Sequence, residues 1–177
     1  MNRGSFGGGG VPGSGGSPIM KQFVLNAVIL TPFEKKTGVV VIEDGMILEV
    51  ARDALIPEGA SVIDARGLYL SPGFIDLHVH GGGGYSAMSD DPGDIAALCA
   101  AHAACGTTSI LPTTMSAPLS SIYAAVGAIR KAARSFCGAN LLGAHLEGPC
   151  LSLKQCGAQP PGDLKLPGEL DLDGMLD

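Results

Sequence analysis

The chain has 177 residues, of which 46% are apolar and 16% charged, and its formal net charge at pH 7 is −6. This composition predicts a mostly globular protein and disfavours nucleic acid or an anionic membrane as the main partner, because both attract basic surfaces. No apolar run reaches the roughly 18 residues of a membrane-spanning helix, and the N-terminus lacks the apolar core of a signal peptide. With an odd number of cysteines and no C-x-x-C pair, we expect a cytoplasmic protein.

Two kinds of pattern fill the first part of the chain. Residues 1–19 are rich in Gly, Ser and Pro, which predicts a flexible leader outside the folded part. Residues 20–72 are patterned as short β-strands. Within them "VVVIEDGMILEV" predicts a type I′ hairpin turning at Asp44-Gly45, and "SVIDARGLYL" predicts another hairpin turning at Ala65 to Gly67. We therefore expect a small antiparallel module here.

Strand and helix patterns alternate in residues 73–177, which predicts a parallel sheet with helices outside it. Strands are expected in "GFIDLHVH", "TTSILPT" and "NLLGAHLEG". One helix is expected after the N-cap Asp91 with Pro92 in its first turn, and a second from Ser116 to Phe136. Three such units fall short of the about 250 residues of a (β/α)₈ barrel. We expect the beginning of a barrel or doubly wound sheet, in a chain that is truncated.

Two histidines stand at the end of the first of these strands. Asp76, His78 and His80 alternate along "GFIDLHVHGGGG", so that they share one strand face. Two imidazoles at the carboxyl end of a strand can bind one divalent cation, and the following glycines would leave room around it. The alternative is a pair of surface histidines before a flexible loop.

The third predicted strand ends in a similar way. In "AHLEGP", His145 and Glu147 share a face, and Glu147 is the last residue before a Gly-Pro turn. Glu147 is a candidate third metal ligand, or else it binds backbone amides of its own turn. His145 is equally compatible with supporting a ligand and with packing in the core.

Other polar residues near these strands carry weaker signals. Thr113 and Thr114 close the second strand, where they could line a site, although capping and turn hydrogen bonds are the commoner use of such hydroxyls. His102 lies on the apolar face of a predicted helix and is interpreted as a packed histidine.

These motifs carry a family resemblance. "PGFIDLHVHGGGG", "GTTSILPT" and "HLEGP" followed by "GAQPP" resemble the amidohydrolase superfamily, and within it the N-acetylglucosamine-6-phosphate deacetylases, from about Met20 to Pro161. "HLEGP" with the later loop is the more specific signal, because most of the superfamily uses a carboxylated lysine in place of this glutamate. The resemblance implies an α/β fold: an incomplete (β/α)₈ barrel, here its first three βα units in residues 73–177, preceded by the N-terminal part of a small β-sandwich in residues 20–72.

The resemblance also implies a reaction, the metal-dependent removal of acetate from N-acetylglucosamine 6-phosphate to give glucosamine 6-phosphate. By position, Glu147 would be the principal metal ligand, and His78 and His80 would form a site that only some members use. Ala158 and Gln159 would lie in the substrate-binding loop. One or two divalent ions are implied, with Zn²⁺ the commonest and Fe²⁺ an alternative. The partner would be a small amino-sugar phosphate, and the full-length relative a homodimer.

The chain departs from the family pattern at Gln159, at Cys150, which takes a position that is usually aromatic or aliphatic, and in the later site residues. Gln159 replaces a histidine that usually contacts the substrate. The later metal-binding histidines and the catalytic aspartate are expected beyond Asp177, so we expect this chain alone to be inactive. Two alternatives remain: another amidohydrolase acting on a cyclic amide or nucleobase, which Glu147 in place of lysine disfavours, and a non-catalytic truncated relative that serves as an interaction module.

Overall fold

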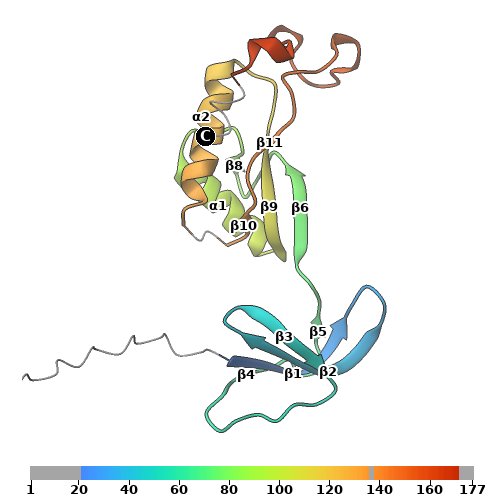
Figure 1. Cartoon of the computed structure of the whole chain (residues 1–177). Coiled ribbons are helices and arrows are strands. Elements are labelled where there is room, and N and C mark those ends of the chain that lie inside the picture. The colour runs from blue at the N-terminus through green and yellow to red at the C-terminus, as the bar shows by residue number, and fades with distance from the viewer. Residues whose placement is uncertain (1–20, 136–137, 172–177) are drawn as a thin grey trace, which may run out of the picture. The chain divides into compact units, whose positions relative to one another are not determined.

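The computed structural model describes residues 21–135 and 138–171, in which it shows two compact units (Figure 1). The first unit ends at Pro72 and the second begins at Gly73. The predicted leader, residues 1–19, lies outside the described residues, as does Phe136 at the predicted end of the second helix. No helix in the described ranges is long and apolar enough to cross a membrane.

The first unit is one mixed five-stranded sheet in the order β3-β2-β1-β4, with β5 also paired to β1. Antiparallel pairing joins β1 to β2 and β2 to β3, whereas β4 and β5 run parallel to β1. The antiparallel prediction was therefore correct for only part of this unit. The strands are β1 Lys21–Leu30, β2 Lys35–Glu43, β3 Met46–Ala51, β4 Ser61–Asp64 and β5 Tyr69–Leu70.

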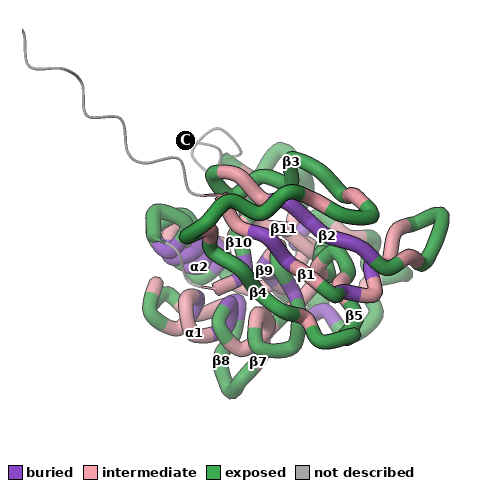
Figure 2. Tube along the Cα trace, turned by 90° about the horizontal axis from the view of Figure 1, so that it is seen from below, coloured by how far each residue is buried: buried purple, intermediate pink, exposed green. Residues whose placement is uncertain are grey.

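The predicted hairpin at Asp44-Gly45 is confirmed. These residues join β2 to β3 with φ values of 49° and 78°, and a type I′ turn requires positive φ at both central positions. Buried residues run along β1 and β2 on both faces of the sheet, which makes these two strands the centre of the unit (Figure 2).

The second predicted hairpin, in "SVIDARGLYL", was wrong, because β4 and β5 both pair with β1 and not with each other. The intervening residues stay beside β1: the Ala65 N–H donates to the Leu25 carbonyl, and the Gly67 N–H to that of Asn26. Arg66 and Gly67 have φ values of 51° and 80°, opposite a bulge in β1 where Asn26 has a φ of 53°. The glycine therefore marks a matched irregularity in two neighbouring strands and not a reversal of the chain.

In the second unit, a parallel sheet has β9 at its centre, with β6 on one side and the short strands β10 and β11 on the other. The helices α1 and α2 pack on the same side of β9, around Ile110, in the main core of this unit (Figure 1). The elements are β6 Phe74–Val79, β7 Gly81–Gly82, β8 Tyr85–Ser86, α1 Pro92–Ala103, β9 Thr107–Thr114, α2 Leu119–Ala132, β10 Asn140–Leu141, β11 His145–Leu146, and the 3₁₀ turns Leu153–Gln155, Pro161–Asp163 and Pro167–Glu169.

The first helix begins as predicted, since the carboxylate of Asp91 accepts a hydrogen bond from the Gly93 N–H at 2.8 Å and Pro92 follows the cap. The second helix begins three residues later than predicted, at Leu119, and already ends at Ala132, before the predicted end at Phe136. Pro118 explains the delay, because a residue that precedes proline is disfavoured in the helical conformation. The predicted third strand is two short strands, interrupted at Gly143, which has a φ of 145°.

Candidate metal centre

The three predicted metal ligands meet at one edge of the second unit's sheet. His78 lies in β6 and His80 directly after it, while Glu147 directly follows β11. Both strands run parallel to β9, which lies between them, so the carboxyl ends of all three strands are at the same edge. The side chains of His78, His80 and Glu147 are 48%, 41% and 33% exposed, which leaves the cluster open to small molecules.

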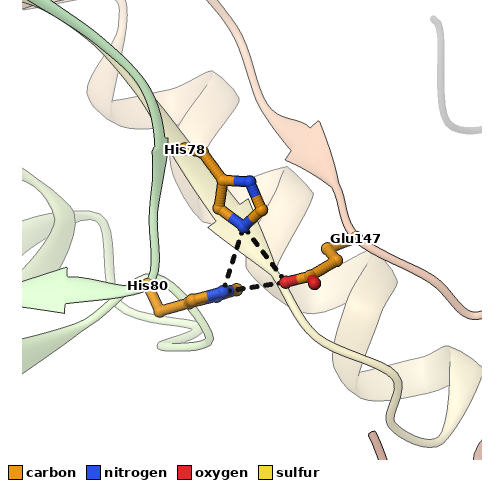
Figure 3. Close-up of side chains that lie close together, drawn as sticks. All are labelled: His78, His80 and Glu147. Carbon is orange, nitrogen blue, oxygen red and sulfur yellow. Dashed lines mark hydrogen bonds and ion pairs between the residues drawn. The ribbon is translucent and has the colours of Figure 1, made fainter. Parts of the chain in front are cut away.

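The side chains converge on one point (Figure 3). Nε2 of His78 lies 3.1 Å from Oε2 of Glu147, Nε2 of His80 lies 2.9 Å from the same oxygen, and the two Nε2 atoms are 3.3 Å apart. A cation about 2.1 Å from each of three ligand atoms would separate them by roughly 3.0 Å at right angles and about 3.4 Å at tetrahedral angles. The observed spacing therefore fits a divalent ion.

The hydrogen bonding of His80 favours a proton or a metal ion between its ring and Glu147. Nδ1 of His80 lies 3.0 Å from the carbonyl oxygen of Thr113, and because a carbonyl only accepts, Nδ1 carries the proton. In a neutral ring Nε2 then presents a lone pair to Oε2 of Glu147, 2.9 Å away. Two lone pairs at this distance repel each other unless a proton or a metal ion lies between them.

The carboxyl of Glu147 is suited to holding a cation. Burial raises the pKa of Glu147, but the hydrogen bonds of His78 and His80, and the positive charges of these rings when they are protonated, outweigh burial and hold the pKa below its ordinary value of 4.5. The carboxylate is therefore ionised at neutral pH. A negative charge beside two imidazole nitrogens is a ligand set that zinc and other divalent ions accept.

The glycines after His80 make room for neighbouring residues such as His102, whereas we expected them to make room for a metal ion. Gly81 and Gly82 form β7, the first strand of the hairpin β7–β8, and a side chain on Gly82 would overlap the ring of His102. Nε2 of His102 lies 3.2 Å from the Gly81 carbonyl, so His102 serves as a packed partner of this hairpin. The absence of side chains allows the hairpin to lie against α1, and crowding at a metal is not needed to explain it.

Asp76 and His145 lie near the cluster without joining it. The Asp76 carboxylate accepts a hydrogen bond from the His78 N–H at 3.1 Å, a local bond within its own strand. The His145 ring lies 4.7 Å from the His78 ring at 90°, and its Nδ1 lies 3.4 Å from the Thr113 hydroxyl. His145 thus packs against the ring of His78 and lies within hydrogen-bonding distance of Thr113.

Comparison with known proteins gives a consistent result. The N-acetylgalactosamine-6-phosphate deacetylase of Escherichia coli O157:H7 is 41% identical over 121 residues, which are 68% of this chain and 31% of that protein. The N-acetylglucosamine-6-phosphate deacetylase of Haemophilus influenzae is 35% identical over 146 residues, 80% of this chain and 38% of the relative. The chain is similar to the N-acetylglucosamine-6-phosphate deacetylases. It spans about a third of the length of these curated relatives, and no family model matches it.

A solved deacetylase structure agrees with the sequence comparison. The crystal structure of the N-acetylglucosamine-6-phosphate deacetylase from Pasteurella multocida matches with a TM-score of 0.72 and 28% identity, over 82% of this chain and 39% of that one. The similarity to the deacetylases thus extends to the folded backbone.

The predicted substrate loop of the deacetylases follows Glu147. Ala158 is exposed, whereas Gln159 is only 7% exposed, and its side-chain oxygen accepts a hydrogen bond from the Ser116 N–H at 2.6 Å. Gln159 therefore ties the loop to the connection between β9 and α2. Its contact with a substrate stays a prediction.

The sequence interpretation missed Ser116. A side chain on Gly148 would overlap the Ser116 hydroxyl, and Gly148 itself has a φ of 84°. The glycine directly after Glu147 was visible in the sequence as a sign of close approach, but nothing in the sequence identified the neighbour.

Proposed function

We propose that His78, His80 and Glu147 bind a divalent cation, with Zn²⁺ as the first candidate, and that the protein is a metal-dependent deacetylase of an N-acetylhexosamine 6-phosphate. The observation that carries the proposal is the convergence of the three ligand atoms on one point, with the His80 ring oriented by a carbonyl so that Nε2 faces Glu147. The relatives' names support the substrate class.

The chain's own residues would have distinct tasks. A bound divalent ion would supply Lewis-acid chemistry, making a water molecule more acidic and polarising the acetamide carbonyl. Glu147 brings the negative charge that retains the ion, and the Thr113 carbonyl keeps the Nδ1 proton of His80 away from it. Ala158, exposed on the loop after Glu147, could meet the sugar through its backbone.

The second unit would then be the beginning of a (β/α)₈ barrel. Its four parallel strands carry helices on one side, and the candidate site lies at the carboxyl ends of β6, β9 and β11, where such barrels build their sites. Residues 20–72 would be part of a small accompanying domain. The protein would work in the cytoplasm, where sugar phosphates are retained.

Acetate release from two substrates tests this function. Because this chain alone is expected to be inactive, the assay uses a chain extended after Asp177 with the remaining strands of a deacetylase. This protein would be treated with chelator and assayed with N-acetylglucosamine 6-phosphate and N-acetylgalactosamine 6-phosphate, before and after Zn²⁺ is added, with unphosphorylated N-acetylglucosamine as control. The galactosamine substrate is included because one relative is named for it. We expect metal-dependent release from at least one phosphorylated sugar. Hydrolysis of a cyclic amide alone, or no hydrolysis by the metal-loaded extended chain, would contradict the proposal.

A further inference from the structure

Thr113 contributes no ligand to the cluster, yet it contacts the segments that carry the ligands. It lies near the end of β9, between β6 and β11, and its side chain is fully buried. Its carbonyl accepts the Nδ1 proton of His80 at 3.0 Å, and its hydroxyl accepts a hydrogen bond from the Val79 N–H, also at 3.0 Å. One residue thus holds both the backbone between the two histidines and the ring of the second.

The hydroxyl joins β6 to β9 at a point where the register of the two strands is irregular. Val79 lies opposite Pro112, and the register between the two strands shifts between Asp76 and Val79. The hydroxyl of the next residue, Thr113, accepts a hydrogen bond from the Val79 N–H. This bond holds the backbone between His78 and His80 against β9.

The same hydroxyl reaches the other side of β9. It lies 3.1 Å from the Leu111 carbonyl and 3.4 Å from Nδ1 of His145. A hydroxyl has one proton to donate and two lone pairs. The Thr113 hydroxyl uses all of its hydrogen-bonding groups when it donates to the Leu111 carbonyl and accepts from the Val79 N–H and from a His145 ring protonated at Nδ1. His145 in turn packs edge-on against the His78 ring at 4.7 Å.

We propose that Thr113 is a positioning residue of the metal centre, which holds the segment His78 to His80 so that both Nε2 atoms converge with Glu147. The proposal rests on the proposed function for its consequence, the affinity for a metal ion, but its hydrogen bonds are present without one. The outer partners of metal ligands typically contribute a factor of 10 to 100 in affinity.

The adjacent Thr114 provides a matched control. Its side chain is also fully buried, but its hydroxyl has no hydrogen-bond partner among the described residues. Thr113→Val and Thr114→Val therefore remove the same atom from neighbouring buried positions, one bonded and one not. Thr113→Ser retains the hydroxyl and loses only a methyl group. If Thr113→Val does not fold, Thr113→Ala and Thr113→Ser form a pair that differs only in the hydroxyl.

Zn²⁺ affinity, measured by competition with a chromophoric chelator, and the absorption spectrum of the Co²⁺-loaded protein are the first readouts. We expect Thr113→Val to bind Zn²⁺ about 10- to 100-fold more weakly, with an altered Co²⁺ spectrum. Thr113→Ser and Thr114→Val should match the wild-type protein in both. A folded Thr113→Val variant with wild-type affinity and spectrum would overturn the positioning role while leaving the metal centre intact.

A second readout needs no metal. Hydrogen exchange of the Val79 amide, followed by NMR in metal-free protein, should be slow in the wild type and in Thr113→Ser, and at least tenfold faster in Thr113→Val. Wild-type protein that binds no metal but protects Val79 in this way would contradict the proposed function and support the role of Thr113. Equal exchange in all variants would overturn that role.

Discussion

The side-chain oxygen of Gln159 lies 2.6 Å from the backbone nitrogen of Ser116 and accepts its hydrogen bond, although the two residues are 43 positions apart in the sequence. Both residues are buried, at 7% and 3% exposure. The bond fastens the loop after Glu147 to the connection between β9 and α2. It assigns Gln159 a task within the protein, at a position where the deacetylase resemblance implies a contact with substrate.

Loss of this acceptor should destabilise the protein. In Gln159→Leu the Ser116 N–H would be left buried without a partner, which typically costs about 1–3 kcal/mol. We expect a lower free energy of unfolding in urea. Gln155→Leu, an exposed position in the same loop, is the control and should change it little. If the two variants are equally stable, the bond contributes nothing, and a contact between Gln159 and substrate becomes the better explanation.

Gly148 should not tolerate a side chain. Gly148→Ala would place an L-residue at a φ of 84°, at a cost of roughly 1–2 kcal/mol, and would also press its Cβ against the Ser116 hydroxyl. Because Glu147 precedes it, we expect both thermal stability and metal affinity to fall.

The double variant Gly148→Ala with Ser116→Ala separates these two effects. It removes the hydroxyl but leaves the backbone strain, so it should recover part of the lost stability. A double variant no more stable than Gly148→Ala alone would show that the contact with Ser116 is not the obstacle.

Glu147 should be indispensable for metal binding. Glu147→Gln preserves the size of the side chain but removes the negative charge that faces both imidazoles. We expect the affinity for Zn²⁺ to fall by more than the roughly 100-fold upper range for losing an outer partner. Metal content after dialysis, measured by atomic emission, checks this, with the exposed Glu58→Gln as control. Undiminished metal content in Glu147→Gln would remove Glu147 from the site.

Asp64 provides a pH-dependent test in the first unit. The Asn26 amide donates to its carboxylate at 2.8 Å and the Arg66 N–H at 3.0 Å, and these bonds hold the pKa of Asp64 below its ordinary 3.8. Because the pKa is lowered in the folded state, the stabilisation is present above pH 3.8 and is lost as the pH falls through the lowered value.

Asn26→Gly removes the hydrogen bond from Asn26, which lowers the pKa of Asp64 more than the bond from Arg66 does. Glycine accepts the φ of 53° at this position, so the substitution removes the amide and keeps the bulge. We expect the pKa of Asp64 to rise toward 3.8 when its carboxyl is titrated by NMR. A titration midpoint that does not move would show that the backbone bond from Arg66 is sufficient.

The sequence was informative where the determining interactions are local. The turn of a two-residue hairpin depends on the conformation of two adjacent residues. Asp44-Gly45 was therefore sufficient to predict the hairpin between β2 and β3. The start of α1 depends on Asp91 and Pro92, which lie within one turn of it. The spacing of His78 and His80 and the position of Glu147 at the end of a strand were sufficient to place all three at one edge of a parallel sheet, because strand order and direction bring carboxyl ends together.

Tertiary structure decided what depends on partners distant in sequence. "SVIDARGLYL" has the residues of a hairpin, yet β4 and β5 pair with β1, since a matching bulge at Asn26 provides continuous hydrogen bonding there. The bonds from Thr113 to Val79 and His80 span more than 30 residues, and the bond from Gln159 to Ser116 spans 43. A hydroxyl or an amide can form hydrogen bonds with many partners, and the packing of the fold selects one. For Thr113 this is the packing of β9 between β6 and β11. The residue types therefore predicted which atoms could bind a metal, and the fold decided which groups hold those atoms in place.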